Sequence, residues 1–338
     1  MPDLLISSLA GDRPRLTVDT IAADGNLQPL ARCDLDGPPG PLAVSPDRSQ
    51  LYACVTVDGR HLTRSYAVGV DGALAPTGQT DMGANACHLS TDRTGRFLLA
   101  AYYSDGMVTV DPIDADGALG GDRIQKMETE LRAHYIQTDA GNRFAFVPHV
   151  GDANCIYQFR FDPDTGQLTP NDPPQVSPEP GQGPRHLCFH PTGRYAFTDG
   201  EQGSSVTLWD VDTDAGTLSP RQTLSTLPPE GFADTNTCSQ IYITPDGSLI
   251  YAGNRGHHSI AGFRIAADGS LSEVGRFPAD PNPRPMAISP DGGTLFAAGS
   301  SEGGRIIAWR IDPRSGELLT PIYYDCGPVS WVLTLRQE

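Results

Sequence analysis

Short apolar segments recur from one end of the chain to the other, each preceded by turn residues rich in Gly, Pro and Asp. Residues 51–53, 97–99, 144–147 and 195–197 are examples. Apolar runs of this length between turn residues are typical of buried β-strands. The hydrophobic content of 38% is modest, as expected where strands bury alternate positions. The pattern predicts an all-β protein of many short strands.

Seven tight turns share one local pattern, in which a glycine is followed two residues later by a leucine. The seven glycines are Gly25, Gly72, Gly117, Gly166, Gly216, Gly269 and Gly316. The shortest interval between neighbours, from 72 to 117, is 45 residues, and the longest, from 216 to 269, is 53. A repeat of this length lies in the range of propeller blades.

A second turn pattern runs in phase with the first and leads into the apolar segments. Its six copies begin at residues 45, 91, 138, 190, 244 and 289, and the copy at 244 reads Thr-Pro-Asp-Gly. Proline sets φ at the first turn position, aspartate bonds the turn backbone, and glycine takes the left-handed position. Each repeat is therefore expected to hold an inner and an outer hairpin, except the first, which lacks the inner turn.

The excess of outer over inner turns predicts how the structure closes. The first repeat begins with strands at residues 4–9 and 16–22, while residues 329–334 remain after the last outer turn. We expect this C-terminal strand to join the N-terminal strands, because closure leaves no sheet edge open. The predicted fold is an all-β seven-bladed β-propeller of four-stranded antiparallel blades, with residues 1–338 forming a single domain.

Composition narrows the choice of partner and compartment. The formal net charge of −17 argues against nucleic-acid binding, which depends on neutralising phosphates. The sequence contains no apolar run of about 18 residues, the length that indicates a membrane-spanning helix. The N-terminus lacks the basic region followed by an apolar run that is typical of a signal peptide. The seven cysteines form no CxxC pair and are odd in number, which favours core thiols over disulfides. We therefore expect a cytoplasmic protein that binds neither nucleic acid nor membranes.

Polar residues fall at equivalent positions in successive repeats, counted from the last residue of each inner turn. The two ends of an antiparallel hairpin lie together, so these positions should surround one mouth of a central channel. Seven residues before the last turn residue stand His88, His134, His186 and Gln240, and eight residues before it stand Arg185 and Arg284. Eight residues after it stand Tyr103, His149, Glu201 and Arg255. Their convergence predicts a cationic cavity that binds an anionic small molecule.

A passive channel lined by solvated polar side chains is the alternative interpretation. Arginines, histidines and a glutamate are costly to bury unless they are paired or used. A set of them at equivalent positions therefore favours a ligand site at this mouth.

The segments around these residues resemble the lactonase family of seven-bladed propellers, which includes bacterial 6-phosphogluconolactonases of the propeller type and fungal carboxy-cis,cis-muconate cyclases. The similarity extends across nearly the whole chain and is most specific in residues 183–186, Gly-Pro-Arg-His, and 254–257, Asn-Arg-Gly-His. The resemblance implies that the family's histidine, two arginines and glutamate correspond to His134, Arg185, Arg255 and Glu201.

The resemblance also implies a reaction, namely metal-independent hydrolysis of a sugar-acid lactone without a cofactor, with 6-phosphogluconolactone as the suggested substrate. Either Glu201 or His134 would be the base that activates water, while Arg185 and Arg255 hold the developing oxyanion or the substrate phosphate. A cycloisomerase acting on carboxymuconate would use the same four residues, and the sequence leaves both reactions open.

A noncatalytic interaction platform is a third possibility, from another class of protein. Such a platform should expose aromatic or apolar loop residues, but the loops here consist mostly of Gly, Asp, Thr and Pro. The two longest stretches expected to be irregular, residues 170–183 and 227–237, are interpreted either as lids over the channel or as plain surface loops. The oligomeric state is left open.

Overall fold

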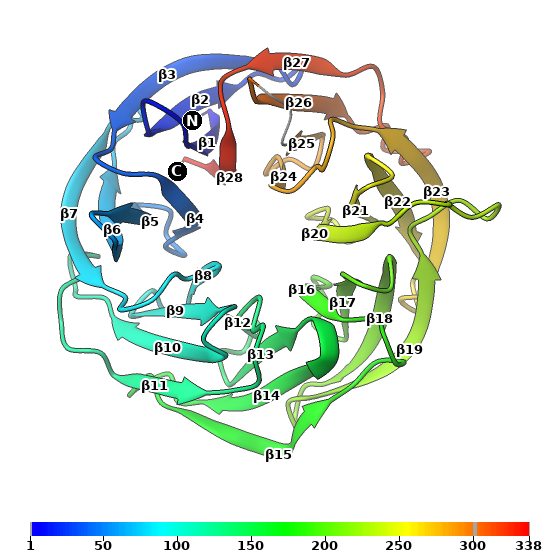
Figure 1. Ribbon diagram of the computed structural model, residues 1–338, viewed down its shortest axis with the longest axis horizontal. Coiled ribbons are helices and arrows are strands. Elements are labelled where there is room, and N and C mark those ends of the chain that lie inside the picture. Colours follow the sequence, from blue (N-terminus) through cyan, green and yellow to red (C-terminus); the bar gives the residue numbers. More distant parts are fainter. Residues whose placement is uncertain (1, 300–302, 338) are drawn as a thin grey trace.

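The computed structural model describes residues 2–299 and 303–337 and contains seven four-stranded antiparallel sheets. The sheets stand like blades around a central axis, each with one strand nearest the axis and one at the rim (Figure 1). The predicted seven-bladed β-propeller is therefore confirmed.

Blades are numbered here in chain order, and their strands are given from the axis outward. Blade 1 contains β28 (Val329–Arg336), β1 (Asp3–Leu9), β2 (Arg15–Ile21) and β3 (Leu27–Asp34). Blade 2 contains β4 (Pro39–Val44), β5 (Gln50–Val57), β6 (Arg60–Val68) and β7 (Leu74–Asp81). Blade 3 contains β8 (His88–Thr91), β9 (Phe97–Tyr102), β10 (Met107–Pro112) and β11 (Gln125–Glu128).

The remaining blades follow the same order. Blade 4 contains β12 (Gln137–Thr138), β13 (Phe144–His149), β14 (Cys155–Phe161) and β15 (Leu168–Val176), with a short 3-10 helix η1 (Gly151–Ala153) after β13. Blade 5 contains β16 (Pro184–Phe189), β17 (Tyr195–Gly200), β18 (Ser205–Asp212) and β19 (Thr217–Ser225). Blade 6 contains β20 (Thr237–Ile243), β21 (Leu249–Arg255), β22 (Ser259–Ile265) and β23 (Leu271–Pro278). Blade 7 contains β24 (Met286–Ile288), β25 (Thr294–Ala298), β26 (Arg305–Arg310) and β27 (Ile322–Asp325).

Blade 1 is assembled from both ends of the chain, as predicted. Strand β28 pairs with β1 from Asp3 opposite Arg336 to Leu9 opposite Val329. The carboxylate of Asp3 also accepts hydrogen bonds of 2.9 and 3.2 Å from the Arg336 guanidinium. Figure 1 shows both termini in this blade. The C-terminal strand therefore supplies the innermost strand that the first repeat lacks.

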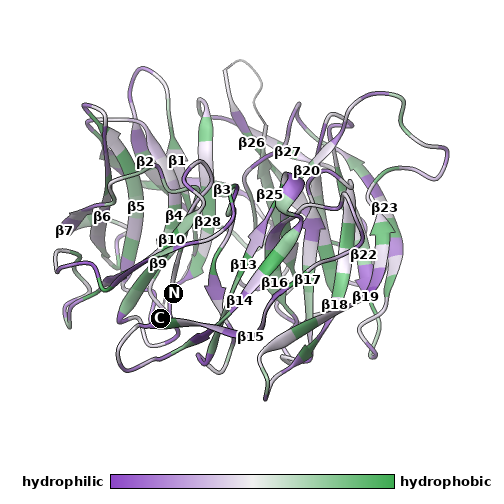
Figure 2. Ribbon diagram, turned by 60° about the horizontal axis from the view of Figure 1, so that its bottom comes forward, coloured by the Kyte–Doolittle hydropathy of each residue, from purple (hydrophilic) through white to green (hydrophobic). Residues whose placement is uncertain are grey.

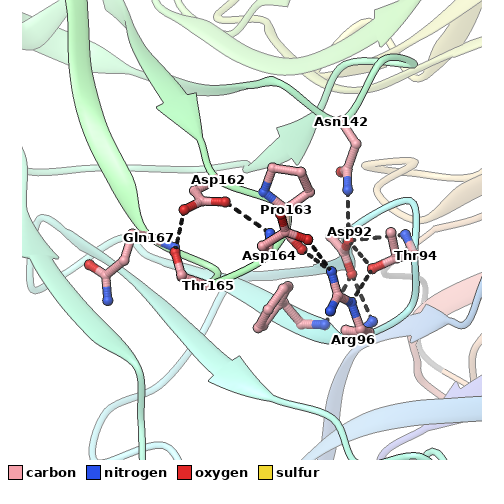
Figure 3. A network of polar contacts seen from close by, with 10 residues as sticks. Asp92, Thr94, Arg96, Asn142, Asp162, Pro163, Asp164, Thr165 and Gln167 are labelled. Atoms are coloured by element: carbon pink, nitrogen blue, oxygen red, sulfur yellow. Dashed lines mark hydrogen bonds and ion pairs between the residues drawn. The ribbon is translucent and has the colours of Figure 1, made fainter.

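The aspartates of the inner turns organise the backbone around them. Asp92, in the turn between β8 and β9, accepts three backbone N–H hydrogen bonds of 2.9 to 3.0 Å. Asn142, in the corresponding turn of blade 4, donates to Asp92 at 2.8 Å (Figure 3). Arg96 extends to the outer turn of blade 4 and donates to the carbonyl oxygen of Pro163 and to the carboxylate of Asp164. These contacts link the turns of neighbouring blades.

The hydrophobic core lies between the faces of adjacent blades rather than in one central mass. Val108 of blade 3 belongs to the same buried cluster as Val147 and Phe159 of blade 4. The ring closes in the same way, since Leu5 of blade 1 belongs to a cluster with Phe296 of blade 7. Figure 2 shows hydrophobic segments along the strands and hydrophilic colour over much of the connecting turns.

No helix in the described part of the chain is long and apolar enough to cross a membrane. All seven cysteines are free thiols. Burial raises the pKa of the Cys54, Cys87 and Cys238 thiols to about 12, so these side chains stay protonated at neutral pH.

Replacing Leu5 by alanine should destabilise the ring closure. Leu5 is 0% exposed and lies at the junction of blades 1 and 7, so truncation leaves a cavity. We expect the free energy of unfolding, measured in urea, to fall by about 2 to 5 kcal/mol. Leu30→Ala on β3 is the matched control, because Leu30 is 40% exposed and should cost far less. Equal losses in both variants would contradict the assigned packing.

Candidate active site

The four residues predicted to be catalytic lie on three consecutive blades at one end of the propeller. His134 precedes β12 in blade 4, and Arg255 ends β21 in blade 6. Arg185 lies in β16 and Glu201 directly follows β17, and the register of these two strands places both residues at the same end of blade 5. Positions separated by about fifty residues in sequence therefore meet at the channel mouth.

Glu201 joins the two arginines. Its Oε2 accepts a hydrogen bond of 2.8 Å from Nε of Arg185 and lies 3.3 Å from Nη2 of Arg255. Arg255 also donates to the carbonyl oxygen of Cys238 at 2.7 Å. The side chains of Arg185 and Glu201 are only 1% and 14% exposed. A guanidinium as deeply buried as that of Arg185 requires a carboxylate partner, which Glu201 provides.

A second carboxylate, that of Asp199, helps to keep Arg185 charged. Burial lowers the pKa of Arg185 to about 10, while the negative charges of Asp199 and Glu201 oppose this shift. Arg185 therefore remains protonated at neutral pH. Burial raises the pKa of Asp199 to about 6, and its Oδ1 accepts the backbone N–H of His186 at 2.9 Å. Sequence reasoning missed Asp199, although strand alternation indicates that residues 199 and 201 share a face.

His134 is buried and neutral. Burial lowers the pKa of its imidazole well below the ordinary value, and the charge of Arg185 acts in the same direction. Its ring centroid lies 5.5 Å from that of Tyr103 and 5.4 Å from that of His186. Nδ1 of His134 is buried and has no hydrogen-bond partner among the described residues. The site thus holds an uncharged imidazole with an unused nitrogen.

Aromatic rings form a layer inside the channel. The ring of His88 lies 3.9 Å from that of Tyr135, 5.5 Å from that of His186 and 6.0 Å from that of Trp331. Burial, with a contribution from Arg185, lowers the pKa of His88 to about 3. The pKa of His186 is also lowered well below its usual value, chiefly by burial. The positive charge of the channel therefore resides on arginines.

Two cavities lie beside this layer. One, of about 370 Å³, is lined by Cys87, Arg284 and Trp331 among other residues. The other, of about 540 Å³, is lined by His88, Tyr135 and Trp331 together with residues of the inner turns. Trp331 lines both cavities, so the aromatic layer lies between the end of the channel that holds Glu201 and the end that holds the inner turns.

Comparison with known proteins identifies the family of the chain. The model of the lactonase, 7-bladed beta-propeller family matches residues 12–331. The chain belongs to the lactonase family. It is 34% identical over 321 residues to a protein of Pectobacterium atrosepticum named 6-phosphogluconolactonase, with 94% of both chains covered. It is 36% identical over 300 residues to a protein of the same name from Erwinia tasmaniensis, with 88% of both covered.

A solved structure extends the likeness to the whole fold. The periplasmic gluconolactonase PpgL of Pseudomonas aeruginosa superposes with a TM-score of 0.92, 25% sequence identity and 100% coverage of both chains. The family resemblance of the sequence and the expectation that the protein is an enzyme of the lactonase family are therefore confirmed.

Arg284 and Tyr103, two of the predicted substrate-binding residues, lie close to the residues predicted to be catalytic. Arg284 precedes β24 in blade 7. Burial is the main cause of the lowered pKa values of His134 and His186, the charge of Arg185 comes next, and the charge of Arg284 also contributes. Tyr103 follows β9, is 37% exposed and packs edge-on against His134. His88 and His186 lie deeper, in the aromatic layer.

His149 and Gln240 have structural contacts instead. Both ring nitrogens of His149 form hydrogen bonds, with the carbonyl oxygen of Val147 at 2.9 Å and with Thr129 Oγ1 at 3.0 Å. Oε1 of Gln240 accepts the backbone N–H of Met286 at 2.8 Å and so connects blades 6 and 7. In the described structure, the polar groups of these two predicted binding residues are used in contacts within and between blades.

Part of the stretch at residues 170–183 forms a strand, contrary to the prediction from the sequence. Residues 170–176 were expected to be irregular, but they belong to β15. Strand β15 is the outer edge strand of its blade, where prolines are tolerated because one side of the strand needs no ladder hydrogen bonds. Beyond it, Gly183 accepts the backbone N–H of Glu201 at 2.8 Å, so this segment supports the site. Residues 227–236 contain no strand, and β20 begins at Thr237.

Within the described ranges, no three or more His, Cys, Asp or Glu side chains come together as a possible metal site.

Replacing His88 by asparagine should flatten the loss of stability on acidification. In the unfolded chain this residue takes up a proton below its ordinary pKa of 6.5, whereas the native imidazole, with a pKa of about 3, does not. The unfolded state thus binds more protons, and wild-type stability falls by up to about 1.4 kcal/mol per pH unit because of this residue. Urea unfolding between about pH 6 and about pH 4 should show a shallower slope for His88→Asn.

The same measurement contains its own control. Above about pH 8 histidine is neutral in both states, so the two proteins should show parallel stability curves there. Parallel curves in the acid range as well would show that His88 titrates normally in the native state.

Proposed function

We propose that this chain hydrolyses a sugar-acid lactone and that its substrate is 6-phosphogluconolactone. The observation that carries the proposal is the buried cluster in which Glu201 joins Arg185 and Arg255 near the neutral ring of His134. The relatives at 34% and 36% identity, which carry the name of this activity, support the choice of substrate.

Lactone hydrolysis adds water to a carbonyl carbon and opens the ring. The water oxygen bonds to that carbon while a base takes one of its protons, and negative charge develops on the carbonyl oxygen. The bond from the carbon to the ring oxygen then breaks, and the proton passes to the ring oxygen, which becomes a hydroxyl group. The site must therefore supply a proton acceptor and cations for the oxyanion.

Arg185 and Arg255 are suited to stabilise the oxyanion. Nη1 of Arg185 and Nε of Arg255 are buried without hydrogen-bond partners in the described structure, so each guanidinium has capacity beyond its contact with Glu201. Preorganised donors in a site that excludes water stabilise developing charge without reorganising during the reaction. In the proposed mechanism Glu201 holds the two guanidinium groups in place.

His134 is the better candidate for the base. Oε2 of Glu201 accepts from Nε of Arg185 at 2.8 Å and lies 3.3 Å from Nη2 of Arg255, so this oxygen is already occupied in holding the two guanidinium groups. The imidazole of His134 is neutral, and its Nδ1 has no partner in the described structure. An anionic substrate would partly neutralise the surrounding arginines and so strengthen His134 as a base.

The other two functions suggested by the sequence gain no observation of their own. A carboxymuconate cycloisomerase would use the same residues, but the relatives with high coverage are named for lactone hydrolysis. Turnover of carboxymuconate in place of 6-phosphogluconolactone, followed by product analysis, would overturn the proposed reaction. A noncatalytic platform does not account for the buried cluster.

His134→Ala should lower kcat for 6-phosphogluconolactone by about 10²- to 10⁴-fold, because the proton acceptor is removed. Added imidazole should restore part of the rate by occupying the space of the missing ring. Stopped-flow measurement of acid release gives the rate above spontaneous hydrolysis. His190→Ala, in the turn between β16 and β17 at the other end of blade 5, is the control and should keep wild-type activity. Full activity in His134→Ala would remove the residue from the mechanism.

Glu201→Gln should lower kcat about 10²-fold, because the arginines lose the charge that orients them. Imidazole should not restore this variant, which distinguishes an orienting carboxylate from a base. Glu128→Gln on the rim strand β11 is the matched control. Rescue of Glu201→Gln by small carboxylates, without rescue of His134→Ala by imidazole, would instead assign the base to Glu201.

A further inference from the structure

The 370 Å³ cavity lies in the half of the channel mouth opposite the catalytic residues. Blades 1, 2 and 3 enclose it, with Pro39, Thr56 and Trp331 in its lining and Arg284 contributed by blade 7. Thr56 occupies the same repeat position in blade 2 as Glu201 in blade 5, so cavity and cluster lie at the same end of the propeller. Glu201 itself does not line the cavity.

Two residues connect the cavity with the catalytic cluster. Cys87 lines the cavity, and the charges of Arg185 and Arg284 both act on its thiol, although burial dominates and raises its pKa. Arg284 also lines the cavity, and its charge acts on His134 as well. A molecule in the cavity would therefore contact Arg284, whose charge reaches the catalytic cluster.

The charge of this cavity is opposite in sign to that of the protein. Its lining contains no Asp or Glu, although the chain has 41 acidic residues and a net charge of −17. Arg284 is the only lysine or arginine in the lining. Arg185 and Arg255 share Glu201, whereas no ion pair within the described residues involves the Arg284 side chain. An uncompensated cation beside an acid-free cavity favours an anionic group.

The remaining lining suits a polyhydroxylated molecule. The indole of Trp331 and the prolines of residues 38–41 offer rigid apolar surface for C–H groups. The hydroxyl of Thr56 is hydrogen-bonded with Nδ1 of His61 at 3.2 Å, and Asn85 adds an amide. The volume lies within the usual range of small-molecule sites, about 300 to 1,000 Å³.

We propose that this cavity is the subsite for the phosphate end of the substrate and that Arg284 is its phosphate-binding cation. The inference rests on the proposed lactone hydrolysis. The lactone carbonyl would face Arg185, Arg255 and His134, while the chain that carries the phosphate extends across the mouth past Trp331. A phosphate monoester carries a charge of about −1.5 to −2, which an unpaired guanidinium binds by charge-assisted hydrogen bonds.

The test compares two lactones that differ only in the phosphate. For Arg284→Gln, we expect KM for 6-phosphogluconolactone to rise roughly tenfold to a hundredfold, the contribution of a charged hydrogen bond. For unphosphorylated gluconolactone, KM should change by less than about twofold, since that substrate makes no phosphate contact. Arg160→Gln on β14 is the matched control, because Arg160 is exposed and has no side-chain hydrogen bond within the described structure.

The outcomes separate the subsite from the reaction. Equal effects of Arg284→Gln on both lactones, or no effect on either, would overturn the phosphate subsite and leave lactone hydrolysis standing.

Calorimetric binding of 6-phosphogluconate and of gluconate tests the subsite without turnover. We expect wild type to prefer the phosphorylated acid and Arg284→Gln to lose that preference. If wild type hydrolyses neither lactone but shows this preference, the proposed reaction fails and the subsite stands. Arg284→Lys, which keeps the charge, should recover part of the preference and excludes a folding defect.

Discussion

The pairing of β1 with β28 is the constraint on which the rest of the structure depends. A propeller blade buries its faces only against two neighbours, so an open ring would expose blades 1 and 7 together with the edge of β1. Closure by strand pairing over the full length of β1 fixes the spacing of all seven blades. Because the spacing is fixed, Arg185, Arg255 and Arg284, from three different blades, can be held near one another despite their repulsion.

The electrostatics of the site follow from burial within this rigid frame. The imidazoles of His88, His134 and His186 are kept neutral by desolvation, so they add hydrogen-bonding groups and aromatic surface but no charge. Arg185 stays charged because Asp199 and Glu201 compensate it. The positive field of the mouth is therefore carried by guanidinium groups, which do not titrate near neutral pH, and it is insensitive to moderate changes in pH.

The sequence was sufficient to predict the fold and the convergence of the cluster around Glu201, because hairpin turns and a repeat of nearly constant length determine both. It was insufficient where a contact depends on side-chain direction. His149 stands at the same repeat position as Glu201 and Arg255, yet its ring bonds Thr129, in the segment that links blades 3 and 4. The turn pattern assigns Trp331 only to the closing strand, since blade 1 has no inner turn from which to count a repeat position. The prolines of residues 170–176 concealed an edge strand.

The acid-free cavity in a strongly acidic protein has a consequence for how an anion reaches it. Within the screening length of the surface, about 8 Å at physiological ionic strength, an approaching phosphate meets the repulsion of the acidic surface that gives the protein its net charge of −17. Inside the mouth it meets the arginines at short range. Dissolved ions weaken the long-range repulsion more than the short-range attraction, so encounter should become faster as salt concentration rises. A basic enzyme acting on the same anion would show the opposite trend.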